Sequence, residues 1–393
     1  MNVEQVLDRT ASKFPEKPAI IFKNQTITFG ELRNKVIKFA NGLAAMGVEK
    51  GDCVAIHLGN GPGYAISYLS AFCLRAVVVP LDLNLKDELV NCLRFADVKV
   101  LITQKMINVN YDAILQQCPK LKHILFYEDQ VQDLIKKSSE KLINAHISES
   151  DPSAIFFTTG TTGQPKGISW NYRHLDNAPK IMEYFLKINS NDIKLCAVPF
   201  SHCGGLVYLQ NCIFYGITAI ILERFHPLRF VKAVKDYNVT CFHIVPAMYE
   251  AILSLRGIES WSLPSLRWAA VFGAPSSPEL LQKFERLCPQ CKFLNGYGLT
   301  ETAPPDVLHH LDRIKRGSVG LSAPWIEMNV LDEQDNPLPT GQVGEVAFKG
   351  WVVMNGYYKA PELTDKVIKN GCCCFKLHLT KENRGSLFIL GRK

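Results

Sequence analysis

The sequence lacks the long apolar run that a membrane-spanning helix requires. Its two most apolar windows, 64–80 and 212–222, are shorter than the roughly 20 apolar residues of a span, and Arg75 interrupts the first. We therefore expect buried helices and strands there, and no membrane span. A secretory signal is not expected either, because the first residues are amphipathic and include Glu4.

A run of five or six like charges is also missing. The 44 Lys and Arg residues exceed the 37 Asp and Glu residues by only seven, and these charges are spread along the chain. The sequence therefore predicts no basic arm and no nucleic-acid partner. The hydrophobic share of 47% excludes a disordered chain, and 393 residues suggest two or three domains.

The thirteen cysteines have no regular spacing. A single CxxC at 288–291 and a run at 372–374 do not form a zinc-binding pattern, so free thiols are the default interpretation. Reduced thiols are typical of the cytosol, and we predict a cytoplasmic protein.

Short segments rich in Val and Ile alternate with helical patterns over the first 320 residues. Such a pattern is typical of parallel βαβ units covered on both faces. An N-terminal hairpin is expected at 19–22 and 26–29. Further strands are expected at 54–58, 77–79, 98–103, 124–127, 154–157, 195–198, 218–222, 241–245, 268–272 and 291–294. The predicted fold class is α/β, with several mixed or parallel sheets and flanking helices.

The pattern changes after residue 320, where close-spaced strands are expected at 327–331, 345–349 and 351–354, separated by turn residues. The expected organisation is an α/β core with two sheet subdomains over 1–320, followed by a smaller β-rich subdomain over 321–390.

A loop rich in threonine and glycine follows the strand expected at 154–157. Its backbone N–H groups, hydroxyls and lysine suit a polyphosphate, although a polar surface loop without a ligand is the alternative. It is not a Walker A loop, because no Gly-Lys-Ser/Thr follows the first glycine. The candidate phosphate-binding residues are Thr158, Thr159, Gly160, Thr161, Thr162, Gly163 and Lys166.

The loop resembles a hallmark of the adenylate-forming superfamily of acyl-CoA synthetases, acyl-AMP ligases and adenylation domains, which ends in Pro-Lys-Gly. The segment 295–302, Asn-Gly-Tyr-Gly-Leu-Thr-Glu-Thr, resembles the second signature of that family. The turn at 273–275 and the segments 341–346 and 356–364 resemble its other motifs. The resemblance extends from about residue 15 to the end of the chain.

The resemblance implies the large N-terminal lobe of an acid–thiol ligase, which forms an acyl-adenylate from ATP and transfers the acyl group to a thiol. It implies ATP and Mg²⁺ as cofactors, and coenzyme A or a phosphopantetheine as acceptor. Tyr297 would stack on adenine, Thr300 would bind the α-phosphate and Glu301 would hold Mg²⁺. The other implied nucleotide-binding residues are Gly273, Ala274, Pro275, Asn295, Gly296, Gly298 and Arg392.

His202, in Pro199-Phe-Ser-His202, resembles the histidine that borders the acid pocket in acyl and aryl ligases. Relatives that activate amino acids tend to have an Asp here, and no acidic residue lies between 199 and 222. A fatty or aryl acid is therefore the expected substrate, with an amino-acid-activating adenylation domain as an alternative. A histidine with a purely structural role is the other interpretation of His202.

Two departures from the family pattern stand out. The Thr-Gly-Asp triplet that binds ribose is missing between 371 and 387, and His378 lies near the position of its Asp. The residues 391–393 resemble the family's hinge, so we expect the family's C-terminal domain to be absent. A catalytically impaired nucleotide- or acyl-binding pseudoenzyme or fragment is therefore a second hypothesis. A carrier protein and a homodimer are left open as partners.

Overall fold

The computed structural model describes residues 2–85, 87–106, 109–143, 146–158, 166–274, 276–369, 371–381 and 386–392, with the backbone alone at 87, 375–379 and 390–392. Its α-helices are α1 Val3–Lys13, α2 Phe29–Ala45, α3 Pro62–Cys73, α4 Asp87–Phe95, α5 Tyr111–Gln117, α6 Gln132–Lys137, α7 Asn177–Leu186, α8 Cys203–Tyr215, α9 Pro227–Asp236, α10 Pro246–Leu253, α11 Pro278–Leu287 and α12 Pro361–Val367. A π-helical turn, Tyr127–Val131, precedes α6, and 3₁₀ turns occur at Tyr172–Asp176, Ile258–Ser260 and Thr300–Thr302.

The strands confirm the α/β class. They are β1 Pro18–Phe22, β2 Gln25–Thr28, β3 Cys53–His57, β4 Val77–Pro80, β5 Val98–Thr103, β6 His123–Phe126, β7 Pro152–Thr158, β8 Lys166–Asn171, β9 Ile193–Cys196, β10 Thr218–Ile221, β11 Cys241–Ile244, β12 Trp268–Val271, β13 Lys292–Asn295, β14 Val307–Leu308, β15 Leu321–Ser322, β16 Glu327–Leu331, β17 Val343–Lys349, β18 Gly356–Tyr357, β19 Ile368–Lys369, β20 Cys372–Lys381 and β21 Leu387–Arg392.

The chain forms two compact units, and each draws on separate parts of the sequence. Unit 1 comprises residues 1–175, 199–223 and 357–359. Unit 2 comprises residues 176–198, 224–356 and 360–393. The organisation expected from the sequence, with boundaries at 320 and 390, stays a prediction.

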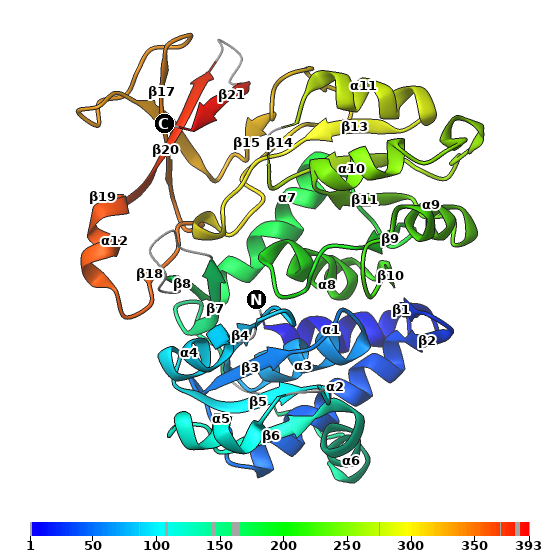
Figure 1. Cartoon of the computed structure of the whole chain (residues 1–393), viewed down its shortest axis with the longest axis vertical. Helices are drawn as coiled ribbons and strands as arrows, with labels where there is room; N and C mark the ends of the chain where they lie inside the picture. The colour runs from blue at the N-terminus through cyan, green and yellow to red at the C-terminus, as the bar shows by residue number, and fades with distance from the viewer. Residues whose placement is uncertain are drawn as a thin grey trace. The chain divides into compact units, whose positions relative to one another are not determined.

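Unit 1 contains a sheet in the order β6-β5-β3-β4-β7-β8, in which β8 alone is antiparallel to its neighbour (Figure 1). Helices α4 and α5 pack against this sheet, with Leu89, Leu93 and Ile114 in one core with Val79 and Leu101. Helix α3 is buried along its whole length, which explains why the window from 64 to 80 is apolar on every side. Unit 1 also contains three further paired strands. Strand β1 pairs in parallel with β10 and forms the expected antiparallel hairpin with β2.

Local sequence sets the start of α2. Thr28 Oγ1 accepts a hydrogen bond from the N–H of Glu31, and the Glu31 carboxylate accepts one from the N–H of Thr28. This reciprocal capping box satisfies two backbone donors at the helix start.

Unit 2 contains the parallel strands β9-β11-β12-β13 and an antiparallel sheet built from β16, β17, β20, β19 and β21. The strand predicted at 351–354 is wrong, because this segment forms a turn. Gly350 has a φ of +128°, which breaks the extended chain after β17. The segment is apolar because Val352, Val353 and Met354 are buried. No helix of the described residues is long and apolar enough to cross a membrane.

Candidate functional site

The threonine–glycine loop of unit 1 connects β7 to β8. Thr158 and Lys166 are paired across this antiparallel hairpin, at the two ends of the loop. The base of the hairpin is held closely, because the N–H of Tyr358 donates to the carbonyl of Gly167 at 2.7 Å. A Cβ on Gly167 would lie 2.9 Å from the Ile155 side chain. Thr159, Gly160, Thr161, Thr162 and Gly163 lie outside the described residues.

His202 lies in unit 1 at the N-terminus of α8. It is the N-cap residue, and its Nδ1 accepts a hydrogen bond from the N–H of Gly204 at 3.1 Å. The residue is exposed, whereas Cys203, which follows it, is buried. Cys203, through its charge when ionised and its hydrogen bond, raises the pKa of His202 to about 9.

Two side chains that the sequence pattern did not reveal hold the segment before His202. Asn60 Oδ1 accepts from the N–H of Phe200 at 2.8 Å, and the hydroxyl of Tyr68 donates to the Phe200 carbonyl at 3.1 Å. Phe200 is completely buried. Because both contacts join residues far apart in the chain, only the folded structure identifies them.

The second signature lies in unit 2, on the turn that follows β13. Asn295 ends β13, and its Oδ1 accepts a 2.5 Å hydrogen bond from Ser276. Glycine is required at two positions of this turn because a side chain would clash with its neighbours. A Cβ on Gly296 would lie 2.1 Å from the Phe272 ring, and one on Gly298 would lie 2.4 Å from Pro304. This close packing fixes the path of the backbone through the turn.

The three residues with expected chemical roles lie together on this turn. The Tyr297 ring stacks on Phe348, with ring centroids 6.0 Å apart and planes at 18°. Thr300 and Glu301 form the 3₁₀ turn that follows, where Thr300 is buried and Glu301 is half-buried. The carbonyl of Glu301 accepts from the N–H of Met354 at 2.8 Å, so the turn is joined to the segment after β17.

Asp306 organises this turn, although it belongs to none of the predicted motifs. It is completely buried, and its Oδ2 accepts from the Thr302 hydroxyl and, at 3.4 Å, from the N–H of Leu299. The Tyr297 carbonyl accepts from the N–H groups of both Asp306 and Val307. A buried carboxylate five residues after Glu301 therefore stabilises the loop that carries Tyr297 and Thr300.

The remaining predicted residues are placed as follows. Gly273 follows β12 with a φ of +85°, and Ala274 beside it is exposed. Pro275 lies outside the described residues. Arg392 ends β21, and the backbone of His378 is paired with Glu345 and with Gly391; the side chains of Arg392 and His378 lie outside the described set.

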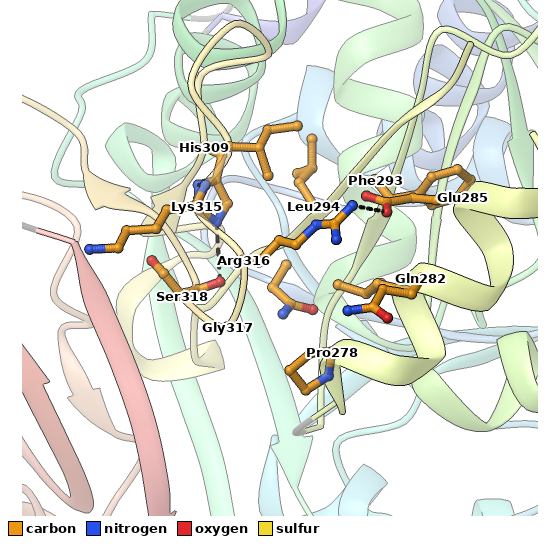
Figure 2. Close-up of a pocket in the computed structure, with 13 residues that line it drawn as sticks. Pro278, Gln282, Glu285, Phe293, Leu294, His309, Lys315, Arg316, Gly317 and Ser318 are labelled. Atoms are coloured by element: carbon orange, nitrogen blue, oxygen red, sulfur yellow. Dashed lines mark hydrogen bonds and ion pairs between the residues drawn. The ribbon is translucent and has the colours of Figure 1, made fainter. Parts of the chain in front are cut away.

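A hollow in unit 2 lies between α11, β13 and the loop 309–318, as Figure 2 shows. Arg316 extends to Glu285 on α11 and forms a 2.6 Å ion pair with it. His309 is buried beneath the loop, with its Nε2 3.1 Å from the Ser318 carbonyl. Burial lowers the pKa of His309. The imidazole therefore acts as a neutral link within this loop.

The residues of the turn after β13 fit a nucleotide held through a divalent cation. A half-buried carboxylate at Glu301 and a hydroxyl at Thr300 are hard oxygen donors, which Mg²⁺ and phosphate groups favour. Gly296 and Gly298 keep the backbone free of side chains beside Tyr297. Unit 2 thus brings together Asn295, Tyr297 and Glu301, while unit 1 carries the hairpin ends and His202.

The fold and these motifs define the class of the protein, an AMP-forming acid–thiol ligase. A family model described as AMP-binding enzyme matches residues 7–358. Because this match covers most of the sequence, the chain belongs to the AMP-binding enzyme family.

Its relatives are ligases of coenzyme A. The chain is 29% identical to a long-chain-fatty-acid–CoA ligase of Bacillus subtilis (strain 168), over 94% of this chain and 72% of that protein. It is 30% identical to a feruloyl-CoA synthase of Amycolatopsis sp, over 92% of this chain and 73% of the relative. It is also 29% identical to an acyl-CoA ligase of Aspergillus fumigatus, and the match covers 87% of this chain and 63% of that protein.

Solved structures show the same fold. The inhibitor-bound N-terminal domain of FACL13 from Mycobacterium tuberculosis matches all of this chain and all of that one, with a TM-score of 0.92 and 22% identity. The anthranilate CoA ligase AuaEII, in complex with anthranoyl-AMP, matches with a TM-score of 0.94 and 20% identity, over all of this chain and 78% of that chain.

Proposed function

We propose that the chain activates a fatty or aryl carboxylic acid with ATP, forming an acyl-adenylate and releasing pyrophosphate. The acyl group then passes to the thiol of coenzyme A. A carrier-bound phosphopantetheine is the alternative acceptor. The observation that carries the proposal is the turn after β13, where Gly296 and Gly298 pack without space for a side chain and Tyr297, Thr300 and Glu301 follow in order.

Each residue of the turn has a proposed role. Tyr297 presents its ring to the adenine, and Thr300 donates its hydroxyl to the α-phosphate, where negative charge develops during attack by the acid. Glu301 provides a carboxylate for Mg²⁺, which neutralises phosphate charge when it is bound. Such a reaction needs mainly positioning and charge stabilisation, and a turn fixed by close packing and by Asp306 supplies the positioning.

The hairpin of unit 1 supplies the proposed phosphate cradle. Lys166 and Thr158 border the loop, and Lys166 contributes a positive charge for the β- and γ-phosphates. Gly273, Ala274, Pro275, Asn295 and Arg392 are proposed to complete the nucleotide site.

The choice of a fatty or aryl acid rests on His202. It is exposed at the N-terminus of α8, and the helix that follows is mostly apolar and buried. No Asp or Glu lies between 199 and 222 to bind the ammonium group of an amino acid. The names of the relatives, which include both fatty-acid and aryl-acid ligases, agree with this proposal.

We also propose the domain organisation predicted above, with a core over 1–320 and a β-rich subdomain over 321–390. The cytosol is the proposed compartment, because all thirteen cysteines are free thiols and reduced thiols persist there. A homodimer is tested by light scattering of the eluted protein during size-exclusion chromatography.

An ATP–pyrophosphate exchange assay with a panel of fatty, aryl and amino acids tests the function. We expect exchange with at least one fatty or aryl acid, and a loss of about 100-fold in Lys166→Ala and in Glu301→Gln. Glu259→Gln, which changes an exposed carboxylate in the same unit, serves as the matched control and should retain full exchange. If no acid supports exchange while calorimetry still detects ATP binding, the chain is a nucleotide-binding protein instead.

A further inference from the structure

Helix α9 of unit 2 is fixed by its apolar side, so its polar side faces solvent in a defined orientation. Phe230, Val231 and Val234 are buried. The Phe230 ring meets the ring of Phe242 on β11 edge-on, with centroids 4.9 Å apart. Helix α9 also packs beside α10 (Figure 1). The core of the unit therefore holds the exposed side of α9 in place.

The exposed side of α9 carries three cations. Lys232 and Lys235 lie in one row with Leu228, because residues three and four apart share a face of a helix. Arg229 lies beside that row, and all four side chains are exposed. Leu228 adds an apolar side chain that is 40% exposed. Among the residues that the structure describes, no acid forms an ion pair with Arg229, Lys232 or Lys235. Their charges are therefore available to an external anion.

An open groove of about 410 Å³ lies beside this row. Its lining consists of Lys232, Lys235 and Asp236 from α9, and Ser260, Trp261 and Ser262 from a neighbouring segment. Ammonium groups and hydroxyls both donate hydrogen bonds to phosphate oxygens. Trp261 is half-buried, and an indole favours the boundary between water and the interior of a bilayer. The groove thus combines donors for a phosphate with an aromatic side chain, while the charge of Asp236 opposes an anion.

We propose that the exposed side of α9, together with the groove at Trp261, is a docking surface for a membrane that contains anionic phospholipids. The cations attract the negative surface, the groove receives a headgroup phosphate, and Leu228 and Trp261 contact the interface. Basic residues beside Leu and Trp are the composition that membrane-surface sites share. The surface would bring the chain to the phase into which a fatty acid partitions, a link that rests on the proposed function, whereas the binding itself does not.

The expected strength follows from the charges on α9. Each basic residue near an anionic surface strengthens binding about fivefold, which is equivalent to about 1 kcal/mol. Asp236 offsets one of the three cations, so two charges remain in excess on the helix. We therefore expect the chain to bind an anionic surface about 20-fold more strongly than a neutral one.

Cosedimentation of the full chain with lipid vesicles tests the proposal. Vesicles of phosphatidylcholine alone are compared with vesicles of an equimolar mixture of phosphatidylcholine and phosphatidylglycerol, in a low-salt buffer without ATP or an acid substrate. We expect the chain to prefer the mixed vesicles by about 20-fold. Added salt should weaken that binding, because dissolved ions screen exposed charges.

Charge variants locate the surface. Lys232→Glu combined with Lys235→Glu should lower binding to the mixed vesicles to the level seen with phosphatidylcholine. Asp236→Asn should raise binding about fivefold, an increase that simple damage to the surface does not produce. The matched control combines Lys283→Glu with Lys292→Glu, which make the same change of net charge at exposed positions on α11 and β13. This control should retain most of the binding.

Equal binding to the two kinds of vesicle, or no binding to either, would overturn the proposal. An equal loss in the two double variants would also overturn it, because net charge alone would then explain the binding. Exposed substitutions of this kind have little effect on stability, so the unfolding midpoint of each variant should match that of the parent chain. The vesicle assay contains no nucleotide, so its failure and a failure of the exchange assay are independent results.

Discussion

Replacing Gly296 by alanine tests whether close packing fixes the nucleotide turn. The added Cβ would lie 2.1 and 2.4 Å from two carbons of the Phe272 ring and 2.8 Å from Cδ1 of Leu308. Ordinary contact begins near 3.4 Å, so the ring must move by about 1.3 Å, which is 3.4 Å less 2.1 Å. The backbone cannot retreat freely, because the N–H of Gly296 is bonded to the carbonyl of Val271 at 3.0 Å.

The expected cost follows from these contacts. Leu308 is completely buried, whereas Phe272 is half-buried and can turn partly toward solvent. Overpacking of this kind costs about 1–3 kcal/mol, and we expect a value near the middle of that range, about 2 kcal/mol. Because Asn295 and Tyr297 flank the displaced residue, KM for ATP in the exchange assay should rise by about tenfold or more.

A double-mutant cycle tests whether the clash with Phe272 causes the loss of stability. Unfolding in guanidinium chloride is measured for Gly296→Ala, Phe272→Ala and the double variant. Removing the ring relieves the clash, so the two substitutions together should cost at least 1 kcal/mol less than their sum (about the coupling seen between touching residues). Gly59→Ala is the matched control, because its Cβ meets no atom closer than 3.5 Å. Additive effects, or an unchanged KM for ATP, would refute the reasoning.

Three further predictions concern other residues of unit 2. Asp306→Asn should weaken the turn, because the buried carboxylate loses its charge-assisted bonds, and should cost about 2 kcal/mol of unfolding free energy together with a raised KM for ATP. Asp192→Asn should cost about 2 kcal/mol without affecting that KM, because Asp192 is buried against Arg267 and accepts from Thr240 at 2.7 Å. His309, whose folded pKa lies below the unfolded value of about 6.5, stays neutral while the unfolded chain takes up a proton. Stability should therefore fall as pH decreases below about 6.5, and His309→Gln should reduce that slope in urea unfolding series.

Controls separate these effects. Asp335→Asn alters an exposed ion pair with Lys369 and should leave the unfolding midpoint unchanged. If Asp335→Asn lowers the free energy of unfolding as much as Asp192→Asn does, burial does not explain the cost of replacing Asp192. If Asp306→Asn leaves both stability and KM for ATP unchanged, the buried carboxylate does not hold the turn. A pH slope that persists unaltered in His309→Gln would assign the proton uptake to other groups.

Much of the fold was predictable because it depends on local pattern. The strand at 98–103 matches β5 residue for residue, and the strand at 327–331 matches β16. The N-terminal hairpin and most other strands differ by only one or two residues at their ends. The strand expected at 351–354 was wrong because apolar residues are buried equally well in a turn, and alternation alone does not distinguish the two.

Strands β8, β20 and β21 were not predicted, and their sequences explain why. In β8, Lys166 and Gly167 belong to the predicted loop, yet they are paired with Thr158 and Phe157 across the hairpin. The segment of β20 begins with three cysteines and was not predicted as a strand, although residues 375–380 alternate between apolar and polar. Its extended form is stabilised by pairing with β17, which lies earlier in the chain before α12, and with β21, the strand that follows it directly.

The sequence by itself determined the family, the order of the motifs and the chemical types in the candidate site, because these depend on which residues follow one another. Only the tertiary structure revealed that Asn60 and Tyr68 hold the segment before His202 and that Asp306 supports the turn of Tyr297. The physical reason is that hydrogen bonds and packing join atoms that are close in space, and folding alone brings such atoms together.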